Sequence, residues 1–502
     1  MGRIMDAGWY TEKHQDARNR LYHADPAPPP TMPPPLHLQL DRTSRTSLAE
    51  QIRAGIAAAI ESGVLAPGAR LPSWMDLATQ LGVARGTVKA AYERLVDAQL
   101  LVASRAAGTR VADQPAALPG PTGAARSIDA DLQSALYQHF LPGPAVFQMG
   151  VPASDCFPAS LVARLRARAV RDEVEAPASY PDPRGEHALR REIAAHVALS
   201  RGIDCQPSQV FIAAGFTGAL GVALRVIPAP GRAAWVENPG FLPSRTALSI
   251  AQFRTVAVPV DEDGLDVAQG ERLAPDAAVA LVTPGQHAPL GPTLSLARRM
   301  QLLDWAGRAG AWVIEDDYLG ELQLRRRAAP ALASLDRAGR VIHIGSFSKT
   351  ISPTLRLGFV VAPPALVGRF EEAVACLGSA PGPAVQLATA EFMRDGHYMR
   401  HLRRMKRIYA QRSQTLLAAL QARQFHAYAA GLAVVVQLPD GADDRRIARE
   451  AYAYGLAPAP LSGFYCDPGT ARAGLLLGVA TAIERQVPNA CDRLQQLIRM
   501  FA

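Results

Sequence analysis

The sequence predicts a multidomain protein in which a small α+β winged helix-turn-helix unit precedes a much larger α/β domain. Proline-rich and Pro/Gly/Ala-rich stretches at residues 24–35 and 113–127 isolate a compact segment of about 75 residues between them. That segment holds three helix signals followed by two short extended runs. The long stretch after it alternates helix patterns with buried strands that end in serine-, glycine- or carboxylate-bearing loops.

The composition is that of a globular protein from a reducing compartment. The chain has 502 residues, of which 49% are hydrophobic and 20% charged, and its formal net charge of +8 permits nucleic-acid binding. The 5 cysteines are scattered and never form a C-x-x-C pair, which argues against a disulfide framework or a zinc site. The N-terminus lacks the apolar run of a signal peptide, and no apolar stretch is long enough for a membrane span. We therefore expect a cytoplasmic protein without a metal site.

Helix start and stop signals divide the small segment. A capping box at Ser47 opens a first helix, and Ser73 with Asp76 repeats the signal for a short second helix that ends at Gly82. Apolar residues recur every fourth position of the first helix and predict one buried stripe: Leu48, Ile52, Ile56 and Ile60.

The third helix and the wing carry the residues that could touch DNA. Val88, Ala91 and Leu95 predict its core side, while Arg85 and Lys89 lie on a different side. Such a helix enters a major groove with its first turn, and the extended runs after it form a wing that reaches phosphate or minor groove. A protein-interaction module is the alternative for a three-helix unit. The expected DNA contacts are Arg70, Ser73, Arg85, Gly86, Thr87, Lys89, Arg105 and Thr109.

Lys349 stands out because the chain takes nearly all its positive charge from arginine. Lysine occurs only at Lys13, Lys89, Lys349 and Lys406, among 53 lysines and arginines. Both residue types serve as surface charge, but only the lysine amine condenses readily with an aldehyde to form a Schiff base. Pyridoxal phosphate is such an aldehyde, and it also needs a carboxylate for its pyridinium nitrogen, an anion site for its phosphate and a flat partner for its ring.

Residues suited to these needs follow the ends of predicted strands, where ligands of doubly wound sheets bind. Asp316 and Tyr318 are expected past one strand end, Asp316 to keep the ring nitrogen protonated and Tyr318 to donate to the ring hydroxyl. Arg356 offers a bidentate fork for phosphate, and Phe241 can cover the ring face. Further candidates lie in neighbouring loops and in a glycine-bearing helix start: Ser346, Ser348, Gly215, Phe216, Thr217, Gln286 and His287.

The order of these motifs resembles a known family over nearly the whole chain beyond residue 37. Residues 37–112 resemble GntR-type regulators through "LPS", "DLA", "LGV" and "AYE". From about residue 145 to 500, "ENPGF", "LVTPGQHAPLG", "VIEDDY" and "GSFSKTISPTLRLGF" resemble fold-type I, aspartate aminotransferase-like enzymes. The combination is similar to the MocR-type subfamily of GntR-family transcriptional regulators.

The chain departs from the patterns of these relatives in each domain. Trp74 and Met75 stand where GntR-type regulators usually carry a small polar residue and an arginine, and the wing reads "SRAAGT" instead of "SRPGSGT". In the large domain, Gln286–His287 reverses the usual order of these two residue types.

The resemblance implies a homodimeric, PLP-dependent regulator that binds a double-stranded DNA operator and senses an amino compound or PLP itself. An active aminotransferase with an accessory DNA-binding head is the alternative. Aminotransferases carry an arginine near the C-terminal strand that grips the substrate α-carboxylate. Here Arg472 is nearby but out of register, and Leu475 and Leu476 are nearer the expected place, which favours the regulator.

The expected domain boundaries are a Pro-rich tail at 1–36, the winged helix at 37–112, a linker at 113–130 and the effector domain at 131–502. One feature of the effector domain is left open. Four arginines fall on a single helix face, which is either solvated surface or a second DNA contact. They are Arg400, Arg403, Arg404 and Arg407.

Overall fold

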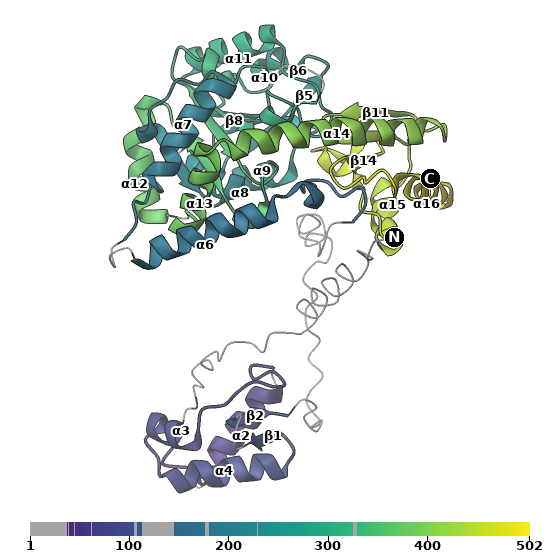
Figure 1. The fold of residues 1–502 in the computed structure, drawn as a ribbon. Coiled ribbons are helices and arrows are strands. Elements are labelled where there is room, and N and C mark those ends of the chain that lie inside the picture. Colours follow the sequence, from purple (N-terminus) through teal and green to yellow (C-terminus); the bar gives the residue numbers. More distant parts are fainter. Residues whose placement is uncertain are drawn as a thin grey trace, which may run out of the picture. The chain divides into compact units, whose positions relative to one another are not determined.

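The structure is a computed structural model in which the chain forms two compact units, Met1–Ser127 and Ile128–Ala502 (Figure 1). The described residues are 38, 40–44, 46–61, 63–104, 108–112, 145–175, 180–227, 229–324, 329–378 and 380–501. The predicted tail at 1–36 and the linker at 113–130 lie outside them. No helix within the described ranges is long and apolar enough to cross a membrane.

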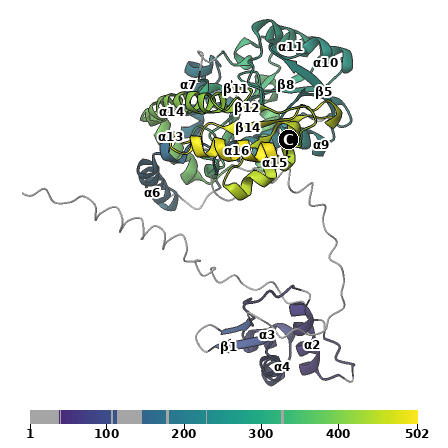
Figure 2. The ribbon, with the colours of Figure 1, turned by 90° about the vertical axis from the view of Figure 1, so that its right-hand side faces the viewer.

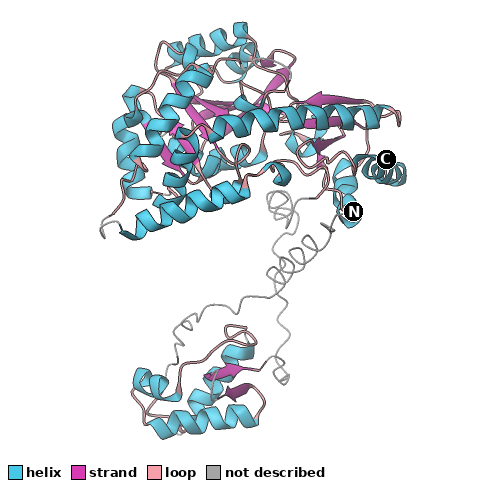
Figure 3. Cartoon of the chain, viewed as in Figure 1, coloured by secondary structure: helices cyan, strands magenta, loops and turns pink. Residues whose placement is uncertain are grey.

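The first unit contains the three predicted helices and the predicted hairpin (Figure 3). The helices are α2 (Leu48–Glu61), α3 (Trp74–Leu81) and α4 (Arg85–Asp97). The strands β1 (Leu101–Ser104) and β2 (Gly108–Val111) pair antiparallel as the two arms of the wing. Apolar side chains from all five elements pack into one core, so the winged-helix prediction is confirmed.

The helix ends of this unit follow the capping signals in the sequence. The Ser73 hydroxyl accepts the backbone N–H of Asp76 at 3.1 Å, which satisfies a donor that the first turn of α3 cannot bond internally. Gly82 ends α3 in the left-handed conformation, with φ 64°, that glycine adopts without steric cost. The three isoleucines of the predicted α2 stripe are buried, but Leu48 is only half-buried because it is the first residue of the helix.

The second unit is built on an eight-stranded sheet with helices on both faces (Figure 2). Its strands, in order across the sheet, are β3 (Val210–Ala213), β10 (Gly358–Val361), β9 (Val341–Ser346), β8 (Trp312–Asp317), β7 (Val279–Val282), β4 (Ala233–Asn238), β5 (Arg254–Asp261) and β6 (Gly264–Leu265). The central strands β9, β8, β7, β4 and β5 run parallel, whereas β10 is antiparallel to β3 and β9.

Successive residues of these strands point into different apolar cores, which is why the strands read as continuous hydrophobic runs. Phe211 and Ile212 of β3 belong to separate clusters, and so do Val313 and Ile314 of β8. The helices of this part of the unit are α6 (Ala159–Glu175), α7 (His187–Arg201), α8 (Gly215–Val226), α9 (Leu242–Ile250), α10 (Val267–Leu273), α11 (Leu296–Ala309), α12 (Val367–Leu377) and α13 (Pro383–Arg394).

A smaller antiparallel sheet completes the second unit. Its strands are β11 (Ala427–Ala430), β12 (Ala433–Gln437), β14 (Gly474–Gly478) and β13 (Ala459–Pro460), in that order. The helices α15 (Asp444–Ala451) and α16 (Val487–Phe501) pack against it. The long helix α14 (His397–Gln421) runs along the outside of the unit from α13 to β11 (Figure 1).

The sheet topology brings two of the predicted loops together. β8 and β9 are adjacent and parallel, with Asp317 paired to Gly345, so both strands end at the same edge of the sheet. Asp316 is not past the end of its strand, as predicted, but is the penultimate residue of β8, because the ladder with β9 extends through Asp317. Its side chain therefore leaves the sheet at this edge, on the opposite face from Glu315 and Asp317.

Candidate functional site

Lys349 lies three residues beyond β9 and is half-buried. Its Nζ donates a hydrogen bond to the carbonyl oxygen of Gly150. Burial disfavours the ammonium form and lowers the pKa of Lys349 to about 8, against the opposing attraction of the Asp316 carboxylate. A substantial fraction of this amine is therefore neutral near physiological pH, which is the state that attacks a carbonyl carbon.

Asp316 is buried, and the pKa of its carboxyl group is raised well above the usual range by burial and by the nearby carboxylates of Asp317 and Glu237. None of the hydrogen bonds or ion pairs within the described part of the chain involves the Asp316 side chain. A buried carboxyl group in this setting is best stabilised by a cationic partner. A protonated ring nitrogen is such a partner.

Two aromatic segments border the same edge of the sheet. Tyr318 follows Asp316 by two residues, and burial raises the pKa of its phenol, so the hydroxyl remains a hydrogen-bond donor. Phe241, at the start of α9, and Phe216, in the first turn of α8, have ring centroids 6.3 Å apart. The structure thus places flat side chains and a neutral phenol on loops beside the Lys349 loop.

Arg356 lies beside the N-terminus of α8. The guanidinium Nη2 of Arg356 lies 3.2 Å from the carbonyl oxygen of Ala214 and 3.1 Å from Oγ1 of Thr217. Gly215 begins α8 with φ 71°, a left-handed conformation that favours glycine, and it lies in contact with the Arg356 guanidinium. Free backbone N–H groups at a helix start, beside an arginine fork, bind phosphate well.

The two predicted serines of the Lys349 loop also lie together. Their hydroxyl oxygens are 3.1 Å apart, and the backbone N–H of Ser348 donates to Oγ of Ser346 at 3.2 Å. Both side chains are partly exposed, so they are accessible to a ligand at this edge.

Gln286 and His287 are both buried, and the histidine ring is committed to the main chain. Nε2 of His287 donates to the carbonyl oxygen of Pro239 at 2.9 Å, and Nδ1 accepts from the backbone N–H of Leu290 at 3.3 Å. Burial lowers the pKa of His287 to about 4, so the ring is neutral. The Gln286 amide packs against Gly431, where a Cβ atom would lie 1.4 Å from its Nε2.

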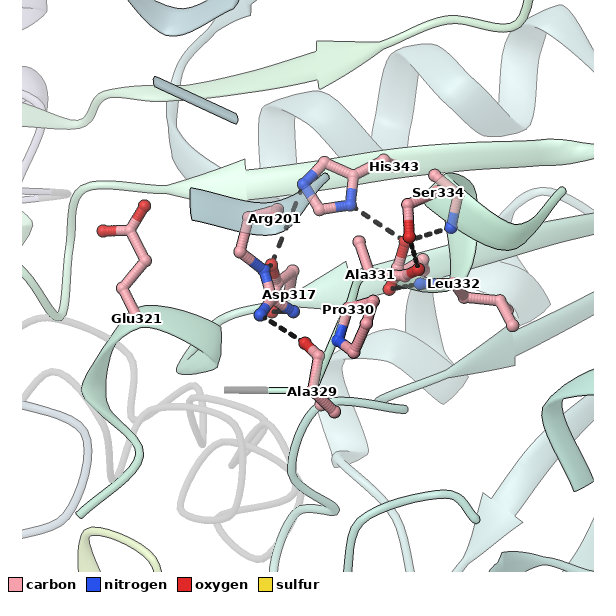
Figure 4. Close-up of polar contacts among 12 residues, drawn as sticks. Arg201, Asp317, Glu321, Ala329, Pro330, Ala331, Leu332, Ser334 and His343 are labelled. Carbon is pink, nitrogen blue, oxygen red and sulfur yellow. Dashed lines mark hydrogen bonds and ion pairs between the residues drawn. The ribbon is translucent and has the colours of Figure 1, made fainter. Parts of the chain in front are cut away.

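A buried network of ion pairs lies on the face of β8 opposite to Asp316 (Figure 4). Arg201 of α7 donates from Nε to Asp317 at 2.6 Å and from Nη1 to the carbonyl oxygen of Ala329 at 2.8 Å. The ring of His343, on β9, lies 2.9 Å from Glu315 through Nδ1 and 3.9 Å from Asp317 through Nε2. These contacts fix the β8 end that presents Asp316 on its other face.

Glu237 and Gly150 are site residues that the sequence analysis missed. Burial raises the pKa of Glu237 to about 7, although Thr283 bonds the carboxylate through its N–H at 3.0 Å and its hydroxyl at 2.6 Å. Gly150 has φ 78°, and a Cβ atom there would lie 3.2 Å from Nζ of Lys349. Glu237 is the first residue of "ENPGF" and could have been noticed as a charge in a buried strand. Nothing in the local sequence distinguishes Gly150.

The C-terminal region offers apolar side chains where an α-carboxylate anchor was considered. Leu475 and Leu476 are adjacent in β14 and fully buried, whereas Arg472 lies before the strand and is exposed. Leu476 packs in a small cluster that includes Met149 and Leu290, next to the segment whose carbonyl accepts the Lys349 amine. Arg472 instead lies close enough to Tyr428 and Tyr465 to act on the ionisation of both phenols.

The residues at this sheet edge fit pyridoxal phosphate. A lysine amine with a lowered pKa, a buried carboxyl group that forms no hydrogen bond or ion pair within the described residues, a neutral phenol and an arginine beside a helix start are gathered at one sheet edge. Together they match the aldehyde, ring nitrogen, ring hydroxyl and phosphate of that molecule.

The predicted DNA contacts of the first unit lie mostly on its surface. Arg85, Gly86 and Lys89 are exposed in the first turns of α4, and Thr87 is half-buried. The remaining described candidates are Arg70, Ser73 and Thr109, of which the first two are exposed and Thr109 is half-buried in β2. The Arg70 side chain approaches the wing, since a Cβ atom at Gly108 would lie 3.2 Å from its Nε. Arg105 lies outside the described residues.

Comparison with family models assigns each unit. Residues 48–111 match the bacterial regulatory proteins of the gntR family. Residues 151–494 match aminotransferase class I and II. The first match spans the helices and wing of the small unit, and the second spans both sheets of the large one.

Full-length relatives combine both parts. The chain is 33% identical over 458 residues to the probable rhizopine catabolism regulatory protein MocR of Rhizobium meliloti, covering 88% of this chain and 92% of the relative. It is 31% identical to the HTH-type transcriptional regulator TauR of Rhodobacter capsulatus, covering 90% and 97%. It is 32% identical to the HTH-type pyridoxine biosynthesis transcriptional regulator PdxR of Corynebacterium glutamicum, covering 73% and 76%.

Solved structures of aminotransferases share the fold of the second unit. An archaeal alanine:glyoxylate aminotransferase matches 74% of this chain and 95% of its own with a TM-score of 0.66 at 22% identity. LysN of Thermus thermophilus, an α-aminoadipate aminotransferase complexed with N-(5'-phosphopyridoxyl)-L-leucine, matches 76% and 98% with a TM-score of 0.64 at 25% identity.

Proposed function

Because this chain belongs to the MocR-type subfamily of GntR-family transcriptional regulators, with an aminotransferase class I and II effector domain, we propose that pyridoxal phosphate bound at Lys349 controls its action on DNA. The chain is a regulator with a DNA-binding winged-helix head. The observation that carries the proposal is the position of Lys349, just beyond β9, at the same sheet edge as the buried Asp316 carboxyl group.

Each residue of the site has a stated role in this proposal. When bound, pyridoxal phosphate supplies an aldehyde that condenses with a primary amine, and a ring that withdraws electrons while its nitrogen is protonated. Lys349 provides the neutral amine, and Asp316 holds the proton on the ring nitrogen. Tyr318 donates to the ring hydroxyl, and Arg356 with Thr217 holds the phosphate. The hydroxyls of Ser346 and Ser348 add donors to the same anion.

The C-terminal strand supports a sensor rather than an efficient aminotransferase. Leu476 and its apolar neighbours give a substrate α-carboxylate no charged partner, and a hydrogen bond to a charged group contributes about 1.5–3 kcal/mol. The effector is then an amino compound bound without that anchor, or pyridoxal phosphate itself. One relative is named for regulating pyridoxine biosynthesis, which agrees with the second possibility.

We further propose that the regulator acts as a homodimer on paired operator half-sites. Cyclic dimers are the commonest oligomers, and a two-fold protein reads a two-fold DNA sequence. If the two heads dock on one side of the duplex, the half-site centres are separated by about 34–36 Å or a multiple of it. The effector then regulates only if it binds one arrangement of the dimer more tightly than another.

Trapping with borohydride tests the cofactor role of Lys349. Wild-type protein incubated with pyridoxal phosphate should absorb visible light and, after reduction, retain the phosphopyridoxyl group on the peptide containing Lys349. The rate of attachment should rise about tenfold per pH unit below the lysine pKa of about 8 and level off above it, because the neutral amine reacts. Mass spectrometry of the digested protein and stopped-flow absorbance measure the two outcomes.

The controls are Lys349→Ala, which should remain colourless and unlabelled, and Lys406→Ala, which should behave as wild type. A wild-type protein that stays colourless in excess cofactor and is not labelled at Lys349 would contradict the proposal. Amino-group exchange with a panel of amino acids and keto acids tests the enzyme alternative. Turnover at about 10 per second, typical of enzymes, would favour a working aminotransferase.

A further inference from the structure

The exposed face of α14 has a charge pattern that the cofactor site does not explain. The 25 residues of α14 include no aspartate or glutamate. Four arginines at helical spacing, here called the basic face, are all exposed: Arg400, Arg403, Arg404 and Arg407. Figures 1 and 2 show α14 at the outside of the effector domain, so the basic face is a surface feature of that domain.

The basic face is unfavourable for the helix that carries it. Arginines three and four positions apart repel one another, by about 0.2–0.5 kcal/mol per pair. Arg400 also lies at the end of the first turn of α14, where the positive end of the helix dipole disfavours a cation. Helix stability therefore does not account for this arrangement, whereas an external anion would remove both penalties.

Within the described residues, none of the four arginines forms an ion pair with a carboxylate. Arg400 bonds the carbonyl oxygen of Asp395, two residues before α14, at 3.1 Å and Nδ1 of His397 at 2.7 Å. Arg403 bonds the carbonyl oxygen of Met399, one turn earlier in α14, at 3.3 Å. Arg412, farther along α14, differs: it is buried and bonds Asp155 and the carbonyl oxygen of Ala480. The buried arginine of α14 thus has a carboxylate partner within the protein, whereas the four exposed arginines have none among the described residues.

The anion that fits the basic face is a regularly spaced polyanion. Arg400 to Arg407 extend about 10 Å along the helix axis at 1.5 Å per residue. One DNA strand carries a phosphate per about 3.4 Å of duplex axis, so this length faces about three phosphates. A membrane surface is a poorer match, because the apolar side of α14 is packed into the effector-domain core and cannot insert into lipid.

We propose that the basic face of α14 is a second DNA-binding surface, located on the effector domain and contacting the phosphate backbone without reading sequence. This proposal rests on the proposed function, since it assumes that the head brings the protein to DNA. The head then supplies base recognition, and α14 adds affinity that depends strongly on salt.

The opposite side of α14 connects this surface to the cofactor loop. The Tyr398 hydroxyl donates to Glu321 at 2.6 Å and lies 3.0 Å from the hydroxyl oxygen of Thr350, the residue after Lys349. DNA held by the basic face would therefore act on a helix that directly contacts the loop of the Schiff-base lysine.

The test compares two triple variants of the full-length protein on a duplex selected with the wild type from a random library. Replacing Arg403, Arg404 and Arg407 by alanine should reduce the slope of log affinity against log salt by about 2.7, at about 0.9 per phosphate contact. Affinity for random DNA should fall by the same factor as affinity for the selected duplex, because phosphate contacts carry no sequence information.

The matched control is Arg164, Arg166 and Arg171 replaced by alanine. These exposed arginines lie on α6 of the same domain. Their replacement removes the same charge but should leave the slope of log affinity against log salt within about 0.5 of the wild-type value. An unchanged slope in the α14 variant, or equal effects of both triples, would overturn the proposal. So would a change in oligomeric mass of the α14 variant, because the face would then belong to a subunit interface. If the wild type itself selects no duplex, the proposed function has failed instead.

Discussion

The head and the cofactor site place their functional side chains in opposite environments. In the head, Arg85 and Lys89 are exposed on α4, a helix that packs into a small apolar core. In the effector domain, Asp316 is buried and the Lys349 amine has a lowered pKa. Side chains that contact DNA need only be held at the right positions on the surface. Side chains that contact a small cofactor need a scaffold that tolerates buried charge.

The scaffold that tolerates this charge is the ion network behind β8. Asp317 and Glu315 flank Asp316 in sequence and are held by Arg201 and His343 from the other face of the sheet. Placing three consecutive carboxylates in a buried strand would be costly without those partners. The following predictions test the contrast with the head, beginning with this network.

Breaking the buried pair should have the largest effect on stability. Arg201→Leu leaves Asp317 buried without its partner, so we expect the free energy of unfolding to fall by about 3–5 kcal/mol. Urea unfolding of the full-length chain followed by tryptophan fluorescence measures it. Arg191→Leu, which removes an exposed pair with Glu192 from the same helix, should cost at most about 1 kcal/mol. Similar losses for the two variants would remove the contrast between buried and exposed charges.

An exposed residue of the head should affect binding without affecting the fold. Arg85→Ala should weaken binding to the selected duplex by about 1–3 kcal/mol and relax specificity at one base position, because a bidentate arginine–base contact is lost. Fluorescence anisotropy with the selected and random duplexes measures the change, and an unaltered unfolding curve is the control. Equal loss on both duplexes would identify Arg85 as a phosphate contact and place its role closer to that of α14.

Removing a cap in the head should give the smallest effect. Ser73→Ala deletes the acceptor for the Asp76 N–H and should destabilise α3 by about 1 kcal/mol, which is about a fivefold faster opening. Hydrogen exchange of α3 peptides in the intact protein measures this rate. Gln80→Ala, an exposed substitution on the same helix, should leave exchange unchanged. If Ser73→Ala also leaves the exchange rate of α3 unchanged, the stability of α3 does not depend on the Ser73 cap.

The features that sequence predicted well are those decided by neighbouring residues. Ser73 and Gly82 delimit α3 because capping and left-handed geometry are local properties. Lys349 can be singled out as a candidate because arginine supplies nearly all the other positive charge, and Arg356 lies close to it along the chain; the roles of both stay predictions. The meeting of Arg356 with Thr217 was harder to predict, although both had been named, because it depends on β10 lying between β3 and β9.

The features that sequence missed depend on contacts between distant segments. The Gly150 carbonyl oxygen accepts a hydrogen bond from the Lys349 amine, 199 residues away in sequence. Arg201 pairs with Asp317, 116 residues away. The partner of a buried charge is set by the order of the strands, which local pattern does not encode. The reading of Asp316 as a loop residue failed for the same reason, since the ladder with β9 extends the strand beyond its apolar run.

The hydroxyl contact between Tyr398 and Thr350 has a thermodynamic consequence. Binding energies that are coupled through one helix must be coupled equally in both directions. If pyridoxal phosphate bound at Lys349 increases the affinity of α14 for DNA tenfold, then DNA increases the affinity for pyridoxal phosphate tenfold. Operator DNA would then act as an allosteric ligand of the effector domain. Protein bound at its operator would release pyridoxal phosphate more slowly than protein free in solution.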